Sequence, residues 1–185
     1  DGFEKVLNGL NRETNLDIYV TGSNSKFLSS DILTEFRGRG DEVRVFPLSF
    51  FEFFSAYNGD KNEAWKEYFT YGGLPLILAK RTEEQKSKYL RDLFEKTYLA
   101  DIIERNHLRG DNVMDALVNV LASSVGSLTN PLKLANTFNS KGTKVTDKTL
   151  RVYIDYLLDA FIIAKADRYD VKGKHYIATP AKYYF

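Results

Sequence analysis

The spacing of apolar residues over the first fifty positions predicts alternating helices and strands. Apolar residues recur at helical spacing over residues 3–10 and again over residues 26–36. Between and after these helices, the β-branched and aromatic runs 16–20 and 42–46 predict short strands, and Pro47 ends the second one. Helices alternating with strands of this type indicate a parallel α/β sheet.

Two strands are too few for such a sheet. Isolated strand pairs are marginally stable, and parallel sheets are covered on both faces. The chain also starts with Asp1, and its first helix follows almost at once. We therefore expect the remaining strands to lie on the N-terminal side, in residues that this chain does not contain.

The pattern becomes helical after Pro47. Ser49 and Glu52 have the spacing of a capping box, and the helix that they open is apolar over most of its surface. A stripe of apolar residues along a later, long helix is more typical of packing than of a cofactor site. The further elements expected in this part are a helix at 64–71, a turn or tight crossing of small residues at 72–75, and the long helix at 82–106.

The last part of the chain resembles a separate unit of three helices and a hairpin. Pro131 suits the first turn of one helix, and Thr146 suits the cap of the next. Three helices followed by a β-hairpin is the element order of a winged helix-turn-helix. The expected elements are helices at 113–125, 131–138 and 147–160, then strands at 161–166 and 174–178 joined by a turn at 168–173.

Composition excludes several classes of protein. A chain of 185 residues with 43% hydrophobic content can bury a core, and its net charge of +1 gives no argument for a nucleic-acid or membrane partner. Cysteine is absent, which excludes a disulfide framework and thiolate chemistry. No apolar run approaches the roughly 18 residues that span a bilayer. We expect a cytoplasmic protein without a membrane partner.

Four stretches of sequence together suggest a family. They are VTGSNSKFLSSDILTEFRGRGDEVRVFPLSFFEFF at 20–54, YGGLP at 71–75, LADIIERN at 99–106 and AKYYF at 181–185. In this order and spacing they resemble the prokaryotic AAA-type P-loop ATPases that carry a C-terminal domain of the DUF4143 kind. The resemblance covers almost the whole chain. It implies a nucleotide-hydrolysing domain joined to a winged-helix module.

The resemblance also implies a domain organisation. Residues 1–48 would be the C-terminal part of an AAA-type ATPase core, residues 49–108 a helical lid or linker region, and residues 109–185 a winged-helix-like domain of the DUF4143 type. The expected fold is thus an α/β remnant of a P-loop NTPase, with parallel strands plus helices, followed by a helical linker and a winged helix-turn-helix domain. We expect the whole chain to be mostly α.

The same resemblance bears on catalysis. In that family the Walker A loop and the Walker B strand lie before the position where this chain begins, and no GxxxxGK[ST] motif occurs here. The phosphate cradle and the Mg²⁺ ligands would then both be missing. ATP and Mg²⁺ are accordingly expected in the full-length protein and not on this fragment, which alone is expected to be inactive.

Polar residues follow the first predicted strand directly. Ser23 and Asn24 stand at its carboxyl end, where α/β sheets place ligand contacts, and a hydroxyl or amide there could orient an attacking water. A turn in which these side chains hydrogen-bond to their own backbone is the alternative. The resemblance favours a sensor role for the γ-phosphate.

The stretch TEFRGRG holds two arginines. Arg37 and Arg39 carry permanent charges, so either could stabilise the charge that develops on a γ-phosphate, in its own subunit or in a neighbour. Alternatively, Arg37 satisfies the last carbonyls of a helix and Gly38 is its left-handed cap. We favour Arg39 over Arg37 as the arginine-finger-like residue.

The predicted winged helix offers few groups to DNA. The basic candidates are Lys144, Lys148, Arg151 and Lys174, and acidic and apolar residues surround them. We therefore favour a protein partner or a neighbouring subunit over DNA. Two rival functions remain open: a DNA-binding winged-helix regulator, and an adaptor without catalysis that binds another protein through the aromatic segment 50–54.

Overall fold

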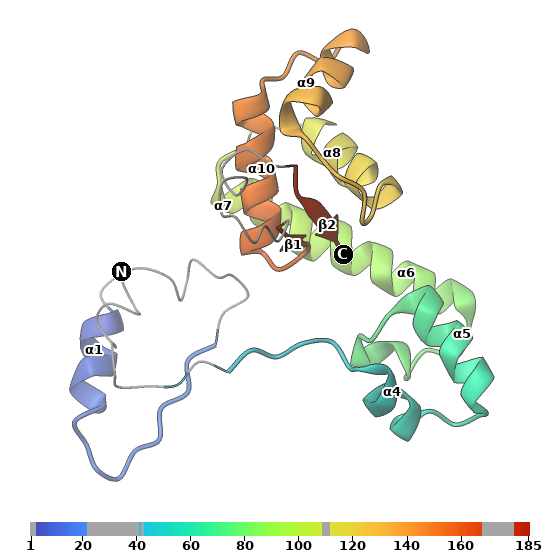
Figure 1. Cartoon of the computed structure of the whole chain (residues 1–185). Helices are drawn as coiled ribbons and strands as arrows, with labels where there is room; N and C mark the ends of the chain where they lie inside the picture. The colour runs from blue at the N-terminus through green and yellow to red at the C-terminus, as the bar shows by residue number, and fades with distance from the viewer. Residues whose placement is uncertain (1–2, 22–40, 42, 109–111, 168–179) are drawn as a thin grey trace, which may run out of the picture. The chain divides into compact units, whose positions relative to one another are not determined.

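The structure, a computed structural model, describes residues 3–21, 41, 43–108, 112–167 and 180–185. The chain divides into two compact units, one formed by residues 41–101 and the other by residues 1–40 together with 102–185. Over the described residues the chain is mostly helical and contains one two-stranded sheet (Figure 1). The expectation of a mostly α chain is therefore confirmed.

The N-terminal region keeps its predicted helix but not its predicted strands. Helix α1 spans Phe3–Leu10, as its apolar spacing predicts. Residues 16–20 and 43–46 form no strand, so the prediction of parallel strands there is wrong for the described residues. A strand needs a neighbour for its backbone groups, and Tyr19 and Val45 are each 92% exposed. The predicted helix at 26–36 lies outside the described residues.

Helix α4 spans Phe50–Ala56 and begins with the predicted capping box. The Ser49 hydroxyl accepts a hydrogen bond from the Glu52 amide at 3.4 Å, and the Ser49 amide donates to Glu52 Oε2 at 2.8 Å. Two otherwise unpaired donors at the helix start are satisfied reciprocally. The Ser49 hydroxyl also donates to Glu52 Oε2 at 2.7 Å, and this bond first, then the one from the Ser49 amide, lowers the pKa of the Glu52 carboxyl.

Helix α5 spans Lys61–Tyr71 and is followed by the tight crossing that the small residues at 72–75 predict. The Leu48 amide donates to the Gly73 carbonyl at 2.7 Å. A Cβ added at Gly73 would collide with the Leu48 carbonyl oxygen, so this approach requires glycine. The crossing returns the chain to the start of α4, and the 3-10 helix η1, Pro75–Ile77, follows.

The core of the 41–101 unit is aromatic. Phe53, Ala64 and Ile77 are fully buried, and other rings pack against them. The Phe53 and Tyr68 ring centroids lie 5.3 Å apart, and the Tyr68 hydroxyl donates to the Leu48 carbonyl at 2.9 Å. Burial of a phenylalanine side chain contributes about 1.5–3 kcal/mol. The aromatic segment of α4 thus mainly builds this core.

Helical structure continues from residue 83 to residue 105, as predicted, but with a change of helix type. Helix α6 spans Glu83–Leu93, a π-helix, η2, spans Phe94–Leu99, and α7 spans Ala100–Arg105. Thr82 caps α6 by accepting from the Gln85 amide at 3.2 Å. The apolar spacing predicts the helix but gives no indication of the π-helical segment, which is a rare element.

One charged residue of α6 is buried. Lys86 is 7% exposed, its ammonium group lies 2.5 Å from Glu67 Oε1, and it stands 5.4 Å from the centroid of the Tyr71 ring. The Tyr57 hydroxyl donates to the other Glu67 oxygen at 3.3 Å. Buried charges persist when they are paired in this way. This network ties α6 to α5.

Three helices of the C-terminal region follow the sequence prediction closely. Helices α8, α9 and α10 span Asn112–Ser123, Pro131–Ser140 and Asp147–Asp159. Asn130 accepts from the Leu132 amide at 2.9 Å, and Thr146 accepts from the Thr149 amide at 3.1 Å, so both later helices have side-chain caps. The buried residues of the three helices are Val113, Met114, Leu117, Val118, Leu121, Ala135, Phe138, Leu150, Tyr153, Ile154 and Leu157.

The described sheet has a strand that the sequence did not predict. Strand β1, Ala164–Ala166, pairs antiparallel with β2, Lys182–Tyr184. The predicted partner strand, 174–178, lies outside the described residues. The sequence pattern did not predict β2, because the strand has only three residues and lies within the short segment AKYYF at the end of the sequence. Within it, buried Ala181 and Tyr183 alternate with exposed residues, which is the period of a half-buried strand.

The segment around β2 has neighbours on both edges. The Thr129 amide donates to the Ala181 carbonyl at 2.8 Å, and the Gly126 amide donates to the Tyr183 carbonyl at 3.1 Å. On its other edge the same segment pairs with β1. The turn between α8 and α9, the last residues of the chain and β1 therefore form one hydrogen-bonded layer.

Candidate functional site

Five of the predicted site residues lie outside the described part of the chain. They are Ser23, Asn24, Arg37, Arg39 and Lys174. Their roles stay predictions. Among the described residues, no three His, Asp or Glu side chains gather in a way that could hold a metal ion.

The other predicted basic residues lie around the start of α10. Lys144, Lys148 and Arg151 are all exposed. Arg151 Nε lies 3.7 Å from Asp147 Oδ2, one turn earlier on the same helix. Since Asp155 is also exposed, the exposed side of α10 carries both signs of charge. An arrangement of this kind attracts a polyanion less than a uniform basic stripe does.

Charges beside α10 are likewise compensated. Lys165 Nζ of β1 lies 2.8 Å from Asp167 Oδ1, and this hydrogen bond raises the pKa of the lysine. Burial raises the pKa of Tyr183 in β2, so its hydroxyl stays neutral at physiological pH. The charge of Lys165 is thus balanced within its own segment.

The aromatic segment 50–54 is largely committed to the core. Phe53 is fully buried, and Phe50 and Phe54 pack against the same cluster. Phe51 is 79% exposed, so of the four phenylalanines in this segment it is the one that an external partner could cover.

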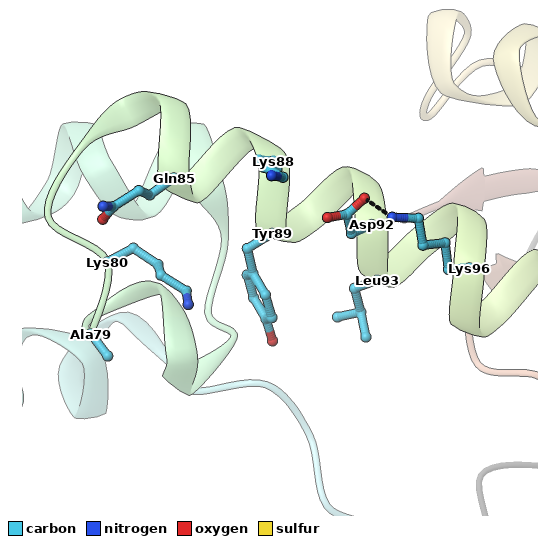
Figure 2. A pocket seen from close by; sticks show the side chains of 8 residues that line it. All are labelled: Ala79, Lys80, Gln85, Lys88, Tyr89, Asp92, Leu93 and Lys96. Atoms are coloured by element: carbon cyan, nitrogen blue, oxygen red, sulfur yellow. Dashed lines mark ion pairs between the residues drawn. The ribbon is translucent and has the colours of Figure 1, made fainter.

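A cleft on the 41–101 unit brings together residues that sequence reasoning did not select. It has a volume of about 670 Å³ and lies along α6, beside the turn after η1 (Figure 2). We call it the α6 cleft. Its polar and apolar lining includes Lys80, Lys88, Tyr89, Asp92, Leu93 and Lys96.

The groups in the α6 cleft have defined charges. Lys80 Nζ lies 5.4 Å from the centroid of the Tyr89 ring. Asp92 Oδ1 and Lys96 Nζ are 2.7 Å apart, and this hydrogen bond lowers the pKa of the carboxyl and raises that of the amine. Burial raises the pKa of Tyr89. At neutral pH the lining therefore holds three ammonium groups, one carboxylate and one neutral phenol.

A pattern in the sequence could have indicated this cleft. Gln85, Lys88, Asp92 and Lys96 follow one another at intervals of three or four residues, which places them on one face of a helix. The interpretation of 82–106 as a packing stripe considered the apolar positions alone. The polar positions beside them mark the exposed side of the same helix.

Comparison with known families separates the chain into two parts. The family described as "Domain of unknown function (DUF8612)" matches residues 62–185. The chain belongs to the DUF8612 family. A second family, described as an AAA domain, matches residues 1–54. The AAA-type resemblance is thus supported for the N-terminal part, whereas the expected DUF4143 type of C-terminal domain is wrong.

Two similar proteins are each described as uncharacterized. An uncharacterized protein of Haemophilus influenzae is 36% identical over 189 residues, which cover 100% of this chain and 47% of that protein. An uncharacterized protein of Methanocaldococcus jannaschii is 29% identical over 186 residues, covering 94% of this chain and 42% of that protein. The DUF8612 chain therefore spans about half the length of these curated relatives.

No solved structure matches the DUF8612 chain significantly. Within the residues that the structure describes, every helix is too short or too polar to cross a bilayer.

Proposed function

We propose that this chain is the C-terminal part of an AAA-type ATPase and that its helical units couple ATP hydrolysis to a protein partner or a neighbouring subunit. The match of an AAA domain to residues 1–54 carries the proposal. The relatives are about twice as long as the matched region, which leaves room for a nucleotide-binding half outside it. ATP and Mg²⁺ belong to that whole protein.

The environment of residues 16–20 and 43–46 supports the proposal. These segments have strand-forming sequences, but Tyr19, Val43 and Phe46 are 92%, 82% and 76% exposed. Apolar side chains of this kind are usually covered, and a run of exposed ones indicates a surface that another part of a protein covers. The missing cover would be the rest of a parallel sheet.

The catalytic roles follow from residue chemistry. Arg39, with Arg37 beside it, would stabilise the charge that develops on the γ-phosphate, because a guanidinium group is always charged and forms paired hydrogen bonds. Ser23 or Asn24 would orient the attacking water. ATP bound with Mg²⁺ would supply the phosphoryl group that is transferred.

The order of elements in the C-terminal region supports a winged-helix module. Helix α8, the bridge at Thr129, helices α9 and α10, and then β1 and β2 occur in the order of a winged helix-turn-helix. In such a module the two helices α9 and α10 and the sheet form one compact body. A body of this kind could move as a unit when the nucleotide state changes.

A DNA-binding regulator is the second candidate. It is favoured by the exposed ammonium groups of Lys144 and Lys148 and opposed by the acidic residues on α10. Because phosphate contacts dominate affinity for DNA, a mixed surface predicts weak binding. We therefore favour a protein partner over DNA.

Hydrolysis by the full-length protein tests the proposal. We expect Arg39→Ala to leave nucleotide binding nearly intact and to lower ATP turnover at least about tenfold, since the residue acts on the transition state. Arg81→Ala, which removes an exposed arginine next to α6, is the matched control and should leave turnover unchanged.

Two outcomes would count against this account. Unchanged turnover in Arg39→Ala would remove the arginine-finger role, and absence of any ATP hydrolysis by the full-length protein would remove the ATPase assignment. Turnover should also be measured with duplex DNA at about 50 mM salt, where phosphate contacts are strong. A large stimulation there would favour the DNA-binding candidate.

A further inference from the structure

The α6 cleft contains more positive charge than its carboxylate balances, because three lysines and one aspartate line it. Lys86, on the buried side of α6, has Glu67 as its partner. Lys80 and Lys88, which line the cleft, form no ion pair with any carboxylate of the described residues. Because neither makes a close ion pair, each can accept a carboxylate from outside as a hydrogen-bonded partner.

The floor of the cleft is apolar. Tyr89 and Leu93, one helical turn apart, project from the same side of α6 (Figure 2). Tyr89 packs against the aromatic core of the unit, and Lys80 lies over its ring. The Tyr89 ring is therefore not free to stack on a nucleic-acid base. Leu93 therefore provides the accessible apolar surface between the lysines of the cleft.

The cleft also contains an acceptor. Asp92, between Lys88 and Lys96 along the helix, is ionised and hydrogen-bonded to Lys96. A carboxylate in the middle of the lining repels a uniformly charged polyanion such as a nucleic-acid backbone. It suits a polypeptide, which offers carboxylates, amide N–H donors and apolar side chains in alternation.

We propose that the α6 cleft is a binding site for a short acidic segment of polypeptide. Two carboxylates of the segment pair with Lys80 and Lys88, an apolar side chain rests on Leu93, and a backbone amide donates to Asp92. The π-helical segment Phe94–Leu99 begins where the cleft ends, and π-helical turns occur frequently at functional sites. The site needs no nucleotide, so it stands apart from the proposed hydrolysis.

Binding of a defined peptide tests the site. The probe is an end-labelled peptide with two Glu residues and a Leu between them in an otherwise uncharged sequence. It is added to the whole 185-residue chain without nucleotide, and binding is followed by fluorescence anisotropy. We expect saturable binding at about 50 mM salt, and binding at least about tenfold weaker for the same peptide with Gln in place of Glu.

Variants localise the binding. Lys88→Gln should weaken it about three- to fivefold, in the range of a partly exposed ion pair, while Lys88→Arg keeps the charge and the affinity. Leu93→Ala should also weaken it. Lys66→Gln changes an exposed lysine of the same unit that does not line the cleft, and should have no effect. Because Lys88 is exposed, its variants are expected to fold, and Trp65 fluorescence checks this.

Three results would overturn the proposal. One is equal binding of the Glu and Gln peptides. Another is an equal loss of affinity in Lys66→Gln and Lys88→Gln, which would indicate attraction to the surface in general. The third is tighter binding of a single-stranded oligonucleotide of the same length, lost in Lys88→Gln, which would make the cleft a nucleic-acid site.

Discussion

Two strand-like segments of this chain meet opposite environments. In residues 43–46, Val45 is 92% exposed and the segment forms no ladder. In β2, Tyr183 is 7% exposed, and its segment bonds to β1 on one edge and to the α8–α9 turn on the other. Both have β-type sequences, so composition alone does not make a strand. The difference lies in the neighbours that each segment finds within this chain.

The same contrast extends to the regions around them. The C-terminal helices bury their apolar faces, and Leu150 and Leu157 are fully buried. In the AAA-matched region, Val6, Leu16 and Val20 are 62%, 47% and 41% exposed. The C-terminal helices therefore share a buried core, while the N-terminal region has apolar residues of the kind that a larger sheet would cover.

The largest expected effect is a loss of stability when a buried side chain of the C-terminal helices is shortened. Leu157→Ala should lower the free energy of unfolding by about 2–5 kcal/mol, because it removes a fully buried side chain and leaves a cavity. Urea unfolding followed by circular dichroism measures it. Leu132→Ala changes a leucine that is 54% exposed in the neighbouring helix α9, and should cost less than about 0.5 kcal/mol. Equal losses in the two variants would contradict the described core.

A smaller effect is expected at the start of α4, where the 41–101 unit begins to fold into helices. Ser49→Ala removes the cap of α4 and should cost about 1 kcal/mol. The fluorescence of Trp65, the single tryptophan, reports unfolding of this unit. Ser55→Ala, at an exposed position in the last turn of the same helix, is the control. It removes only a hydroxyl that donates to the Phe51 carbonyl at 2.8 Å within the helix, so it should cost less than about 0.5 kcal/mol.

The cap also gives this prediction a pH dependence. The pKa of Glu52 is lowered from its ordinary value of 4.5 by its hydrogen bonds with Ser49. A lowered pKa in the folded state contributes stability above the unfolded pKa, and that contribution is lost as the pH falls through the folded pKa. The difference between wild type and Ser49→Ala should therefore shrink below about pH 4.5. A difference that grows on acidification would contradict the capping box.

Local signals in the sequence predicted the helices well and the sheet poorly. Caps such as Ser49, Asn130 and Thr146 act within one turn, so a single sequence contains all the information that they need. Pairing of Ala164 with Tyr184 joins residues far apart in the chain, and no short-range pattern specifies it. The π-helix was missed for a related reason, because its apolar spacing hardly differs from that of an α-helix.

The candidate site divides in the same way. The predicted residues Arg39 and Ser23 rest on a family resemblance, and the structure does not describe them. The α6 cleft was missed because Lys80 comes from a turn and Lys88 from a helix, and only folding brings them to one cavity. The sequence shows the polar face of the helix, but it does not show that the turn carrying Lys80 lies beside that face.

Amide hydrogen exchange at residues 16–20 and 43–46 tests the central claim most directly. The claim is that these segments are strands of a sheet completed by the rest of a longer AAA-type protein. In the 185-residue chain we expect rapid exchange at both segments, since neither has a ladder. In the full-length protein we expect exchange at least about a hundredfold slower. Equally rapid exchange in both proteins would contradict the claim.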